Sequence, residues 1–320
     1  MTVRVGVIGT GFGARVVAPV FRETEGCEIV DVVSARDDAG VATLCDRDDV
    51  DLVSVHSPPF LHTAHVRRAL HGEHAVLCDK PFGAASTDAE TLVAAADAAE
   101  CLHLVNFEFR YDPMRVLLRD LVRDGSVGRP EHVSWTHHSA GSAVPLRPYG
   151  WLFDRASGGG WVGAWGSHIV DALRWTFGEV VDARGACRTV IAERPDRDGV
   201  VHACDAEDAF SAWLTLSGGI TVSIDSTFAA PATLAPRIVV VGDEGTLECV
   251  ADAAIVVRRH DSAREEHERP SIVGDPHLTP MRRWAEVVRD AVEAGIAPPG
   301  APTFADGLAC AKVLDQIRAA

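Results

Sequence analysis

The chain has 320 residues, a length that suggests two domains with a sizeable core. Apolar residues make up 47% and charged residues 24%, a composition typical of globular proteins and not of disordered or fibrous ones. The formal net charge of −16 is spread evenly, which argues against nucleic acid or an anionic membrane surface as the main partner.

Eight cysteines are scattered without a CxxC pair or a His/Cys cluster, so the sequence predicts reduced thiols and no metal site. The first residues lack the apolar core of a signal peptide, and no apolar run approaches the ~20 residues of a membrane span. We therefore expect a soluble, cytoplasmic protein with no membrane partner.

Strands and helices alternate over the first third of the chain. The expected strands are 3–8, 28–34, 51–56, 74–78 and 102–107, and the expected helices are 15–21, 40–44, 62–71 and 87–99. Gly72 lies where a helix C-cap is expected, and Thr87 with Glu90 has capping-box spacing. This alternation predicts a doubly wound parallel sheet with helices on both faces, the α/β class.

A further helix is expected to begin at Asp112 and Pro113 and to end at Gly125. The sequence pattern changes after it. Segments rich in β-branched and aromatic residues now predict strands, with 217–219 as a hairpin turn. The expected strands are 131–137, 180–190, 208–216, 220–228, 237–241 and 254–258, the helices are 167–177, 279–294 and 303–319, and 261–270 is a loop. We therefore predict two domains, 1–125 and 126–320, the second an α+β domain with a largely antiparallel sheet.

A glycine-rich turn joins the first strand to the first helix in the pattern Gly9-x-Gly11-x-x-Ala14. In a dinucleotide-binding Rossmann domain the first glycine permits the tight turn and the second lets the backbone approach the pyrophosphate. The small third residue allows close packing of helix on strand. The helix N-terminus then favours the phosphate anion. We assign cofactor binding to Gly9, Thr10, Gly11, Phe12 and Gly13.

The end of the second strand bears on which nicotinamide cofactor binds. An acidic residue there binds the ribose hydroxyls of NAD, whereas an arginine favours the 2′-phosphate of NADP. This chain has Ser34, then Ala35 where the acid is expected, then Arg36. The pattern favours NADP, with Ser34 and Arg36 at the cofactor. The alternative is NAD, with Asp37 or Asp38 at the ribose.

Five ordered blocks over residues 3–177 resemble the glucose-fructose oxidoreductase, inositol dehydrogenase and rhizopine-catabolism (Gfo/Idh/MocA) family. The blocks are Val7-Ile8-Gly9-Thr10-Gly11, Ser57-Pro58-Pro59-x-x-His62, Cys78-Asp79-Lys80-Pro81, Asn106-x-x-x-Arg110-x-x-Pro113, and Gly158-Gly159-Gly160 with Gly166-Ser167-His168. The resemblance implies NAD(P)-linked oxidation or reduction of a sugar, cyclitol or related polyol. It also implies a homo-oligomer, a dimer or tetramer, formed through the open sheet of the second domain.

The same resemblance implies roles for individual residues. Asp79-Lys80-Pro81 stands where the family has Glu-Lys-Pro beside the nicotinamide, so the carboxylate arm is one carbon shorter. Further cofactor contacts are implied for Ser57, Pro58, His62, Asp79, Lys80 and Asn106, and substrate contacts for Lys80, Arg110 and His168.

Lys80 stands out independently of any family, because arginine is the usual cation here and the two lysines are Lys80 and Lys312. A partly desolvated amine exchanges a proton near neutral pH, which a guanidinium does not. His168 follows Gly166-Ser167, where a helix is expected to begin, and the helix dipole there disfavours an imidazolium. We predict Lys80 and His168 as the catalytic residues.

One residue departs from the family pattern. Many members have an Asp four residues before this histidine, and here that position is Ala164. A water or another carboxylate takes its place, or the site binds without turnover. Trp161 and Trp165 flank Ala164, and Trp151 lies upstream. These tryptophans either stack on a sugar ring as substrate contacts or pack a domain interface.

Three functions are compatible with this pattern. The first is an NAD(P)-dependent dehydrogenase or reductase of a secondary alcohol or ketone on a sugar-like molecule, with Lys80 and His168 moving the hydroxyl proton. The second is a cofactor-binding regulator without turnover. The third is redox-neutral, NAD-dependent glycoside cleavage by transient oxidation of a ring carbon.

Overall fold

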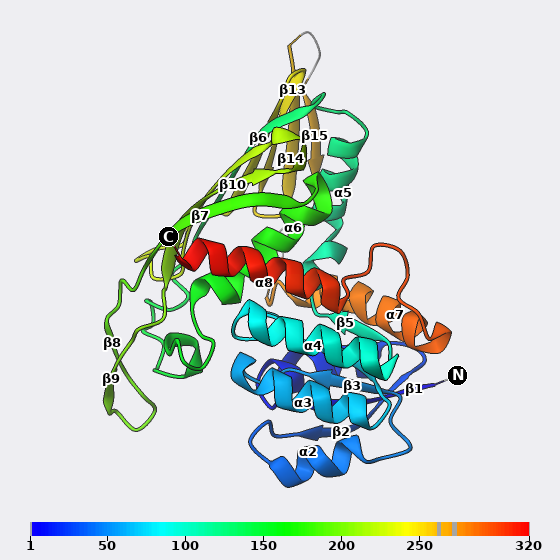
Figure 1. The fold of residues 1–320 in the computed structure, drawn as a ribbon. Helices are drawn as coiled ribbons and strands as arrows, with labels where there is room; N and C mark the ends of the chain where they lie inside the picture. Colours follow the sequence, from blue (N-terminus) through cyan, green and yellow to red (C-terminus); the bar gives the residue numbers. More distant parts are fainter. Residues whose placement is uncertain (1, 261–263, 271–273, 320) are drawn as a thin grey trace. The chain divides into compact units, whose positions relative to one another are not determined.

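A computed structural model describes residues 2–260, 264–270 and 274–319. Contacts divide the chain into two compact units, one of Met1–Tyr111 with Pro276–Lys312 and one of Asp112–Asp275 with Val313–Ala320 (Figure 1). The boundary expected at residue 125 therefore lies inside the second unit, and residues 276–312 return to the first. Among the described residues, no helix has the length and apolar character needed to cross a bilayer.

The first unit is built on a five-stranded parallel sheet, which confirms the predicted α/β fold. The strands are β1 (Val3–Ile8), β2 (Cys27–Val33), β3 (Leu52–Val55), β4 (Ala75–Cys78) and β5 (His103–Val105), in the order β2-β1-β3-β4-β5. The helices are η1 (Gly13–Val17), α1 (Ala18–Glu23), α2 (Asp38–Cys45), α3 (Pro59–His71), α4 (Ser86–Ala99), η2 (Glu108–Tyr111), α7 (Leu278–Ala294) and α8 (Phe304–Ala319), the last ending in the second unit. β1, β3 and β4 are almost wholly buried, as expected for strands covered on both faces.

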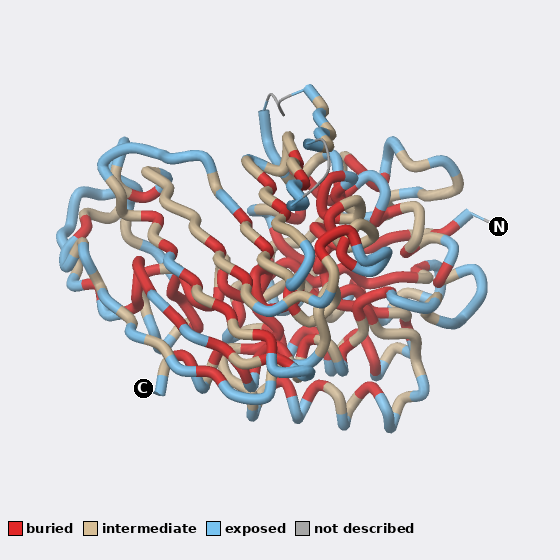
Figure 2. The backbone as a smooth tube through the Cα atoms, turned by 90° about the horizontal axis from the view of Figure 1, so that it is seen from above, coloured by how far each residue is buried: buried red, intermediate tan, exposed pale blue. Residues whose placement is uncertain are grey.

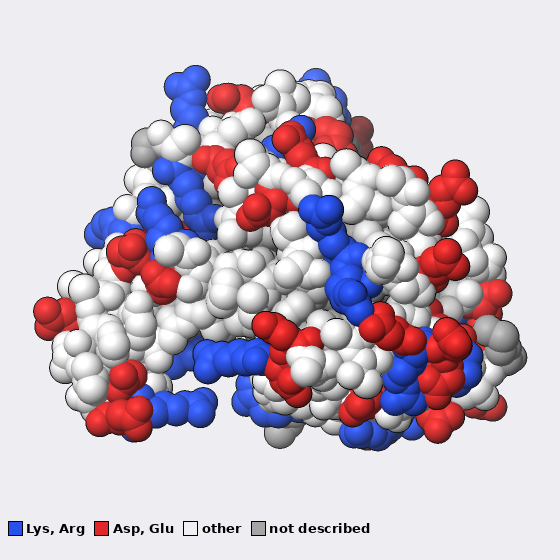
Figure 3. Space-filling view, turned by 60° about the horizontal axis from the view of Figure 1, so that its bottom comes forward, with Lys and Arg blue, Asp and Glu red and all other residues white. Residues whose placement is uncertain are grey.

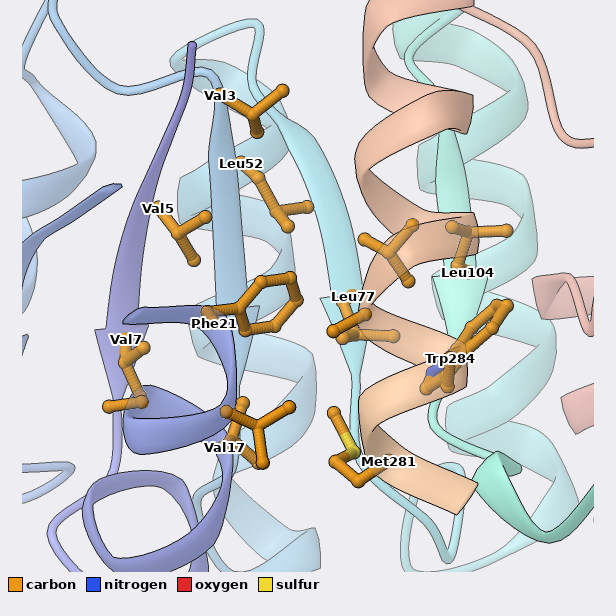
Figure 4. Packing of buried hydrophobic residues seen from close by; sticks show 14 of the residues in the cluster. Val3, Val5, Val7, Val17, Phe21, Leu52, Leu77, Leu104, Met281 and Trp284 are labelled. Carbon is orange, nitrogen blue, oxygen red and sulfur yellow. The ribbon is translucent and has the colours of Figure 1, made fainter. Parts of the chain in front are cut away.

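Helix α7 completes the core of this first unit although it follows the second unit in sequence. Met281, Trp284 and Val288 are fully buried and belong to the same cluster as Val5 and Phe21. Figure 4 shows Met281 and Trp284 directed from α7 toward the strands. The predicted helix 279–294 is confirmed, but its assignment to the second domain is not, because its apolar stripe fills the parallel-sheet core.

The start of α4 corrects a local prediction. The Asp88 carboxylate accepts hydrogen bonds from the backbone amides of Ala84 (3.1 Å) and Ala85 (3.3 Å), so the expected Thr87/Glu90 capping box is wrong. Asp88 lies two residues before Glu90, nearer the start of α4, and Glu90 instead pairs with Lys312 at 3.0 Å.

The second unit contains an eight-stranded sheet that is antiparallel except for one parallel pair, β6 with β11. The order β15-β14-β13-β12-β6-β11-β10-β7 is formed by β6 (Pro130–His138), β7 (Val180–Arg188), β10 (Ala209–Leu216), β11 (Thr221–Thr227), β12 (Arg237–Gly242), β13 (Gly245–Val250), β14 (Ala254–Arg259) and β15 (Glu265–Glu268). The remaining elements are α5 (Pro113–Arg123), η3 (Trp151–Phe153), η4 (Val162–Gly166), α6 (Ser167–Phe177), η5 (Ser217–Gly219) and the hairpin β8 (Glu193–Pro195) with β9 (Val201–Ala203).

Two strands of this sheet differ from the prediction. β13 is not among the expected strands, and β15 lies within the expected loop 261–270, of which 261–263 fall outside the described residues. The hairpin at 217–219 is confirmed, since β10 and β11 pair directly across η5.

One face of the eight-stranded sheet is packed and the other is open. Along β10, Phe210, Ala212 and Leu214 are buried, whereas Trp213 between them is 51% exposed. Figure 2 shows many stretches of the backbone in which buried residues, in red, alternate with intermediate and exposed ones, in tan and pale blue. Basic and acidic side chains are interspersed on the face drawn in Figure 3, with no broad basic patch.

Candidate functional site

The glycine turn after β1 leaves its backbone accessible to a ligand. Gly9 has φ of +132°, and a Cβ there would lie 2.4 Å from the carbonyl oxygen of His56. Gly11 is exposed, and apart from its chain neighbours no atom of the described residues lies within 4 Å of where its Cβ would be. A Cβ on Gly13 would lie 2.9 Å from Val7, so the helix approaches the strand closely at this glycine. These features fit a dinucleotide whose pyrophosphate approaches the backbone at Gly11.

The turn after β2 brings the predicted discriminating residues together at the surface. Arg36 is exposed, and its backbone amide donates to Ser34 Oγ at 3.3 Å. Asp37 caps α2, accepting from the Gly40 amide at 3.0 Å. The Asp37 carboxylate is therefore partly engaged in starting a helix, whereas the Arg36 side chain faces solvent.

A polar cluster occupies the carboxyl ends of β3 and β4. Asp79 Oδ2 lies 3.2 Å from Nδ1 of His56, and Asp79 Oδ1 accepts from Asn106 Nδ2 (3.2 Å) and from the Lys80 amide (2.9 Å). Burial, the largest influence, raises the pKa of Asp79, yet His56, Lys80 and Asn106 together bring it well below its usual range. Asp79 is thus an ionised carboxylate that orients its neighbours, and Lys80 follows it, half-buried.

The predicted residues Ser57, Pro58 and His62 lie at the start of α3, where β3 ends. His62 is fully buried and its Nε2 donates to the Ser57 carbonyl at 2.8 Å, while His65 Nδ1 lies 3.0 Å from Ser57 Oγ. Burial lowers the pKa of His62 to about 4, so its imidazole is neutral at physiological pH. His62 therefore fixes the loop and does not carry charge to it.

Sequence reasoning missed the residues that support the glycine turn from α7. His277, at the start of α7, has Nδ1 2.6 Å from Oε1 of the buried Glu108. Its ring centroid lies 5.1 Å from that of Phe12, and the Phe12 ring lies 5.9 Å from that of His56. His56 follows a buried strand at the carboxyl edge of the sheet, a signal that could have revealed it, whereas His277 carries no motif.

The Arg110 side chain, predicted to contact the substrate, is buried and bonded within the first unit. Its guanidinium is 5% exposed and donates to the Gly300 carbonyl at 3.1 Å and to Asp306 at 2.9 Å. These bonds hold the segment before α8 against η2, so the geometry favours an anchoring role.

In the second unit, Trp161 and Trp165 form part of a stack of parallel rings. The Trp161 ring lies 4.1 Å from Phe228 and 5.8 Å from Trp165, with interplanar angles of 7° and 8°. Trp161 is 8% exposed and its Nε1 donates to Ser226 Oγ at 2.9 Å. Trp161 is thus a packing residue, while the half-buried Trp165 ends the stack. Trp151 instead lines a cavity of about 210 Å³ near Tyr149.

The position of His168 corrects the expected helix start. A π-helical turn, η4, runs directly into α6, so His168 lies in the second turn of a continuous helix. The dipole argument from a helix N-terminus therefore does not apply to it. His168 is 2% exposed and its ring centroid lies 5.5 Å from that of Trp165.

A buried carboxylate that the sequence analysis did not identify holds the true start of this helix. Glu207 Oε1 accepts from the Val162 amide (3.2 Å) and from Arg318 of α8 (2.9 Å). A Cβ on Gly160 would come within 2.2 Å of Glu207 Oε1, which explains the glycine there. Glu207 thus supplies the negative charge that a helix N-terminus favours.

Comparison with known proteins identifies both halves of the chain. Residues 3–107 match the model of an oxidoreductase family with an NAD-binding Rossmann fold, and residues 116–248 match the GFO/IDH/MocA C-terminal domain. An uncharacterised oxidoreductase of Synechocystis is 30% identical over 266 residues, covering 78% of this chain and 71% of its own. A D-apiose dehydrogenase of Paraburkholderia graminis is 28% identical over 91% of this chain and 76% of its own.

A levoglucosan dehydrogenase solved in complex with NADH and levoglucosan superposes with a TM-score of 0.87 at 20% identity, covering 100% of this chain and 97% of that one. At that identity the likeness shows a shared fold. Together with the glycine turn and the cluster around Asp79, these findings show that the chain belongs to the Gfo/Idh/MocA family of NAD-dependent oxidoreductases.

Proposed function

We propose that this enzyme transfers hydride between a nicotinamide cofactor and a carbon that bears a hydroxyl or keto group on a sugar-like substrate. The observation that carries the proposal is the cluster at the carboxyl edge of the parallel sheet, where Lys80, Asp79 and Asn106 lie on the side of the sheet that also bears the Gly9 turn. Ligands of open α/β sheets bind at this edge.

Individual residues have distinct tasks in this proposal. The backbone of Gly9, Thr10, Gly11, Phe12 and Gly13 cradles the dinucleotide, with Ser57, Pro58 and His62 shaping the adjoining loop. A nicotinamide cofactor, when bound there, would supply the hydride donor or acceptor. Lys80 moves the proton of the substrate hydroxyl, with His168 taking part in the same transfer. Asp79, anchored by His56 and Asn106, fixes the backbone of Lys80.

Replacing Lys80 tests the proton-transfer role. We expect Lys80→Met to lower kcat by about 10²- to 10⁴-fold, the usual contribution of a general acid or base, while NADPH still binds. Lys312→Met is the matched control, because Lys312 is half-exposed and pairs with Glu90 at the surface. A loss of less than tenfold in Lys80→Met with intact cofactor binding would refute the role.

For the cofactor we propose NADP over NAD. The exposed Arg36 follows β2 where a 2′-phosphate is recognised, and Asp37 caps α2. Equilibrium binding should therefore be tighter for NADPH than for NADH, and Arg36→Ala should remove the difference while leaving NADH affinity unchanged. Tenfold tighter binding of NADH to the wild-type protein would overturn this preference.

A sugar or related polyol is the proposed substrate class. Two of the relatives are named for sugar substrates, D-apiose and levoglucosan. In this chain the half-buried Trp165, next to His168, offers a flat aromatic surface to the C–H face of a sugar ring. Turnover of NADP⁺ or NADPH with a panel of sugars and cyclitols tests this directly.

The absence of a carboxylate at Ala164 favours a second candidate, a regulator that binds cofactor without turnover. Such a protein would bind NADPH and a sugar but transfer no hydride to any member of the panel. Release of an aglycone without net change in NADPH would instead indicate the redox-neutral cleavage of glycosides.

A homo-oligomer through the open sheet face is also part of this proposal. Trp213 on β10 and Val181 on β7 are 51% and 68% exposed, and large apolar side chains on an open sheet commonly mark an interface. We expect light scattering to give a dimer or tetramer for the wild-type protein and a smaller species for Trp213→Asp. A monomeric wild-type protein would exclude the proposed interface.

A further inference from the structure

Two histidines approach the indole of Trp165 edge-on. The ring centroid of His168, from α6, lies 5.5 Å from that of Trp165 at an interplanar angle of 64°. The ring centroid of His137, from β6, lies 4.3 Å away at 76°. Two distant parts of the chain therefore bring imidazoles to one aromatic surface. His137 is half-buried, as Trp165 is, and the proposed function gives it no task.

The surroundings of His137 leave it uncharged at neutral pH. Burial lowers the pKa of His137 to about 4, with Arg115 and His138 adding to the effect and Asp252 opposing it. Arg115 is 5% exposed and paired with Asp252 at 3.0 Å, so its charge is already balanced. A neutral imidazole offers one donor and one acceptor to a ligand.

One ring nitrogen of His137 makes no hydrogen bond to the described residues. This nitrogen, Nδ1, is buried. Buried polar atoms in folded proteins are nearly always hydrogen-bonded, so an unpartnered one next to a candidate binding surface points to a ligand.

We propose that His137 is a specificity-determining residue that hydrogen-bonds a hydroxyl of an uncharged sugar seated on the indole of Trp165. This inference rests on the proposed function and deepens it by specifying the charge of the substrate. An uncharged ring fits because Arg115, whose charge acts on His137, is already paired with Asp252. The carboxylate of a sugar acid would be desolvated there without a counter-charge.

Its neighbour on the same strand provides a matched control. His138 alternates with His137 along β6 and lies 3.5 Å from Asp225 of β11 through its Nε2. Because successive strand residues face opposite sides, the two histidines differ in face but share sequence context. His138→Gln should therefore report any general effect of altering this end of β6.

The experiment compares His137→Ala, His137→Gln and His138→Gln with the wild-type protein. For each we measure kcat and KM for glucose, its epimers and gluconate, NADPH affinity, thermal stability, and sugar binding by tryptophan fluorescence in the presence of NADPH. We expect His137→Ala to raise the KM of the preferred uncharged sugar about tenfold, the effect of one lost hydrogen bond. It should change the ratio of kcat/KM between epimers, with kcat within about threefold. His137→Gln should recover part of the loss, and His138→Gln should match the wild-type protein.

Each outcome bears on one proposal. If His137→Ala lowers kcat/KM equally for all sugars, or lowers thermal stability and NADPH affinity as well, the residue is structural and the inference is wrong. If gluconate proves the preferred ligand of the wild-type protein, the inference is also wrong. Sugar binding that depends on His137 without any turnover would sustain the inference while refuting the proposed dehydrogenase activity.

Discussion

At the scale of single residues, Gly9 and Gly11 belong to one turn but meet different constraints. Gly9 needs its positive φ and has no room for a Cβ, because the His56 carbonyl is 2.4 Å away. Gly11 has open space. We expect Gly9→Ala to lower the free energy of unfolding by about 2 kcal/mol or more. Gly11→Ala should leave stability unchanged but weaken NADPH binding at least tenfold, as measured by denaturation and by titration calorimetry. Unchanged binding in a stable Gly11→Ala variant would show that no pyrophosphate approaches this backbone.

His62 makes a second residue-scale prediction, on pH. Its folded-state pKa of about 4 lies below the ordinary value of 6.5, so between these pH values the unfolded chain binds more protons than the folded one. Stability from His62 is present above pH 6.5 and is lost as pH falls toward 4, in total about 3 kcal/mol. Urea denaturation at several pH values should show a shallower dependence in His62→Gln over this range. An identical slope would mean that His62 does not remain neutral in the folded protein.

Residues of the site differ in how far the sequence reveals them. Gly9, Gly11 and Lys80 were proposed from the sequence because each is marked by a local pattern or by its rarity, and their roles stay predictions. Glu207 could not be proposed in this way, since its role depends on Val162 and Arg318, which are distant in sequence and are joined only by the fold. His137 lies in an ordinary strand, and its pairing with Trp165 has no local signature.

At the scale of elements, two aspartates that begin helices differ in their environment. Asp37 caps α2 at the surface, while Asp112 is 1% exposed, caps α5 and also pairs with Arg269 at 2.7 Å. We expect Asp37→Ala to lower the free energy of unfolding by about 1 kcal/mol and Asp112→Ala to lower it by about 3 kcal/mol. The second loss is larger because it also leaves the Arg269 guanidinium without its carboxylate partner. Chemical denaturation measures both, and equal losses would show that the Arg269 pair contributes nothing.

Element positions followed from periodicity wherever a strand or helix has one strong pattern. The parallel strands and α5 through α8 were placed to within a few residues, since buried runs and apolar stripes are visible in sequence. The π-helical turns η1 and η4 were not, because a one-residue widening leaves no mark in apolar spacing. β15 was missed because its Glu265–Glu268 sequence is highly polar and resembles a loop.

At the scale of the whole molecule, segments that are far apart in the sequence share one hydrophobic core. A boundary at residue 125 follows from the change of pattern along the sequence, but the first unit takes residues 276–312 for its core and gives up α5. The apolar stripe of α7 is visible in sequence, whereas the sheet on which it packs is not. The part of the fold that could not be predicted is therefore the long-range pairing of α7 with β1, not the existence of either element.

This discontinuity predicts how fragments of the chain behave. Residues 1–111 alone would expose the surface that Met281, Trp284 and Val288 cover, and a large unpaired apolar face opposes independent folding. Residues 1–111 joined by a flexible linker to 276–312 should fold cooperatively and bind NADPH, whereas 1–125 should not. Thermal unfolding followed by circular dichroism, with NADPH titration, distinguishes the two. A cooperative, NADPH-binding 1–125 fragment would show that α7 is dispensable to the first unit. Met281→Ala in the joined fragment, expected to cost about 2–5 kcal/mol, tests the same packing in a single side chain.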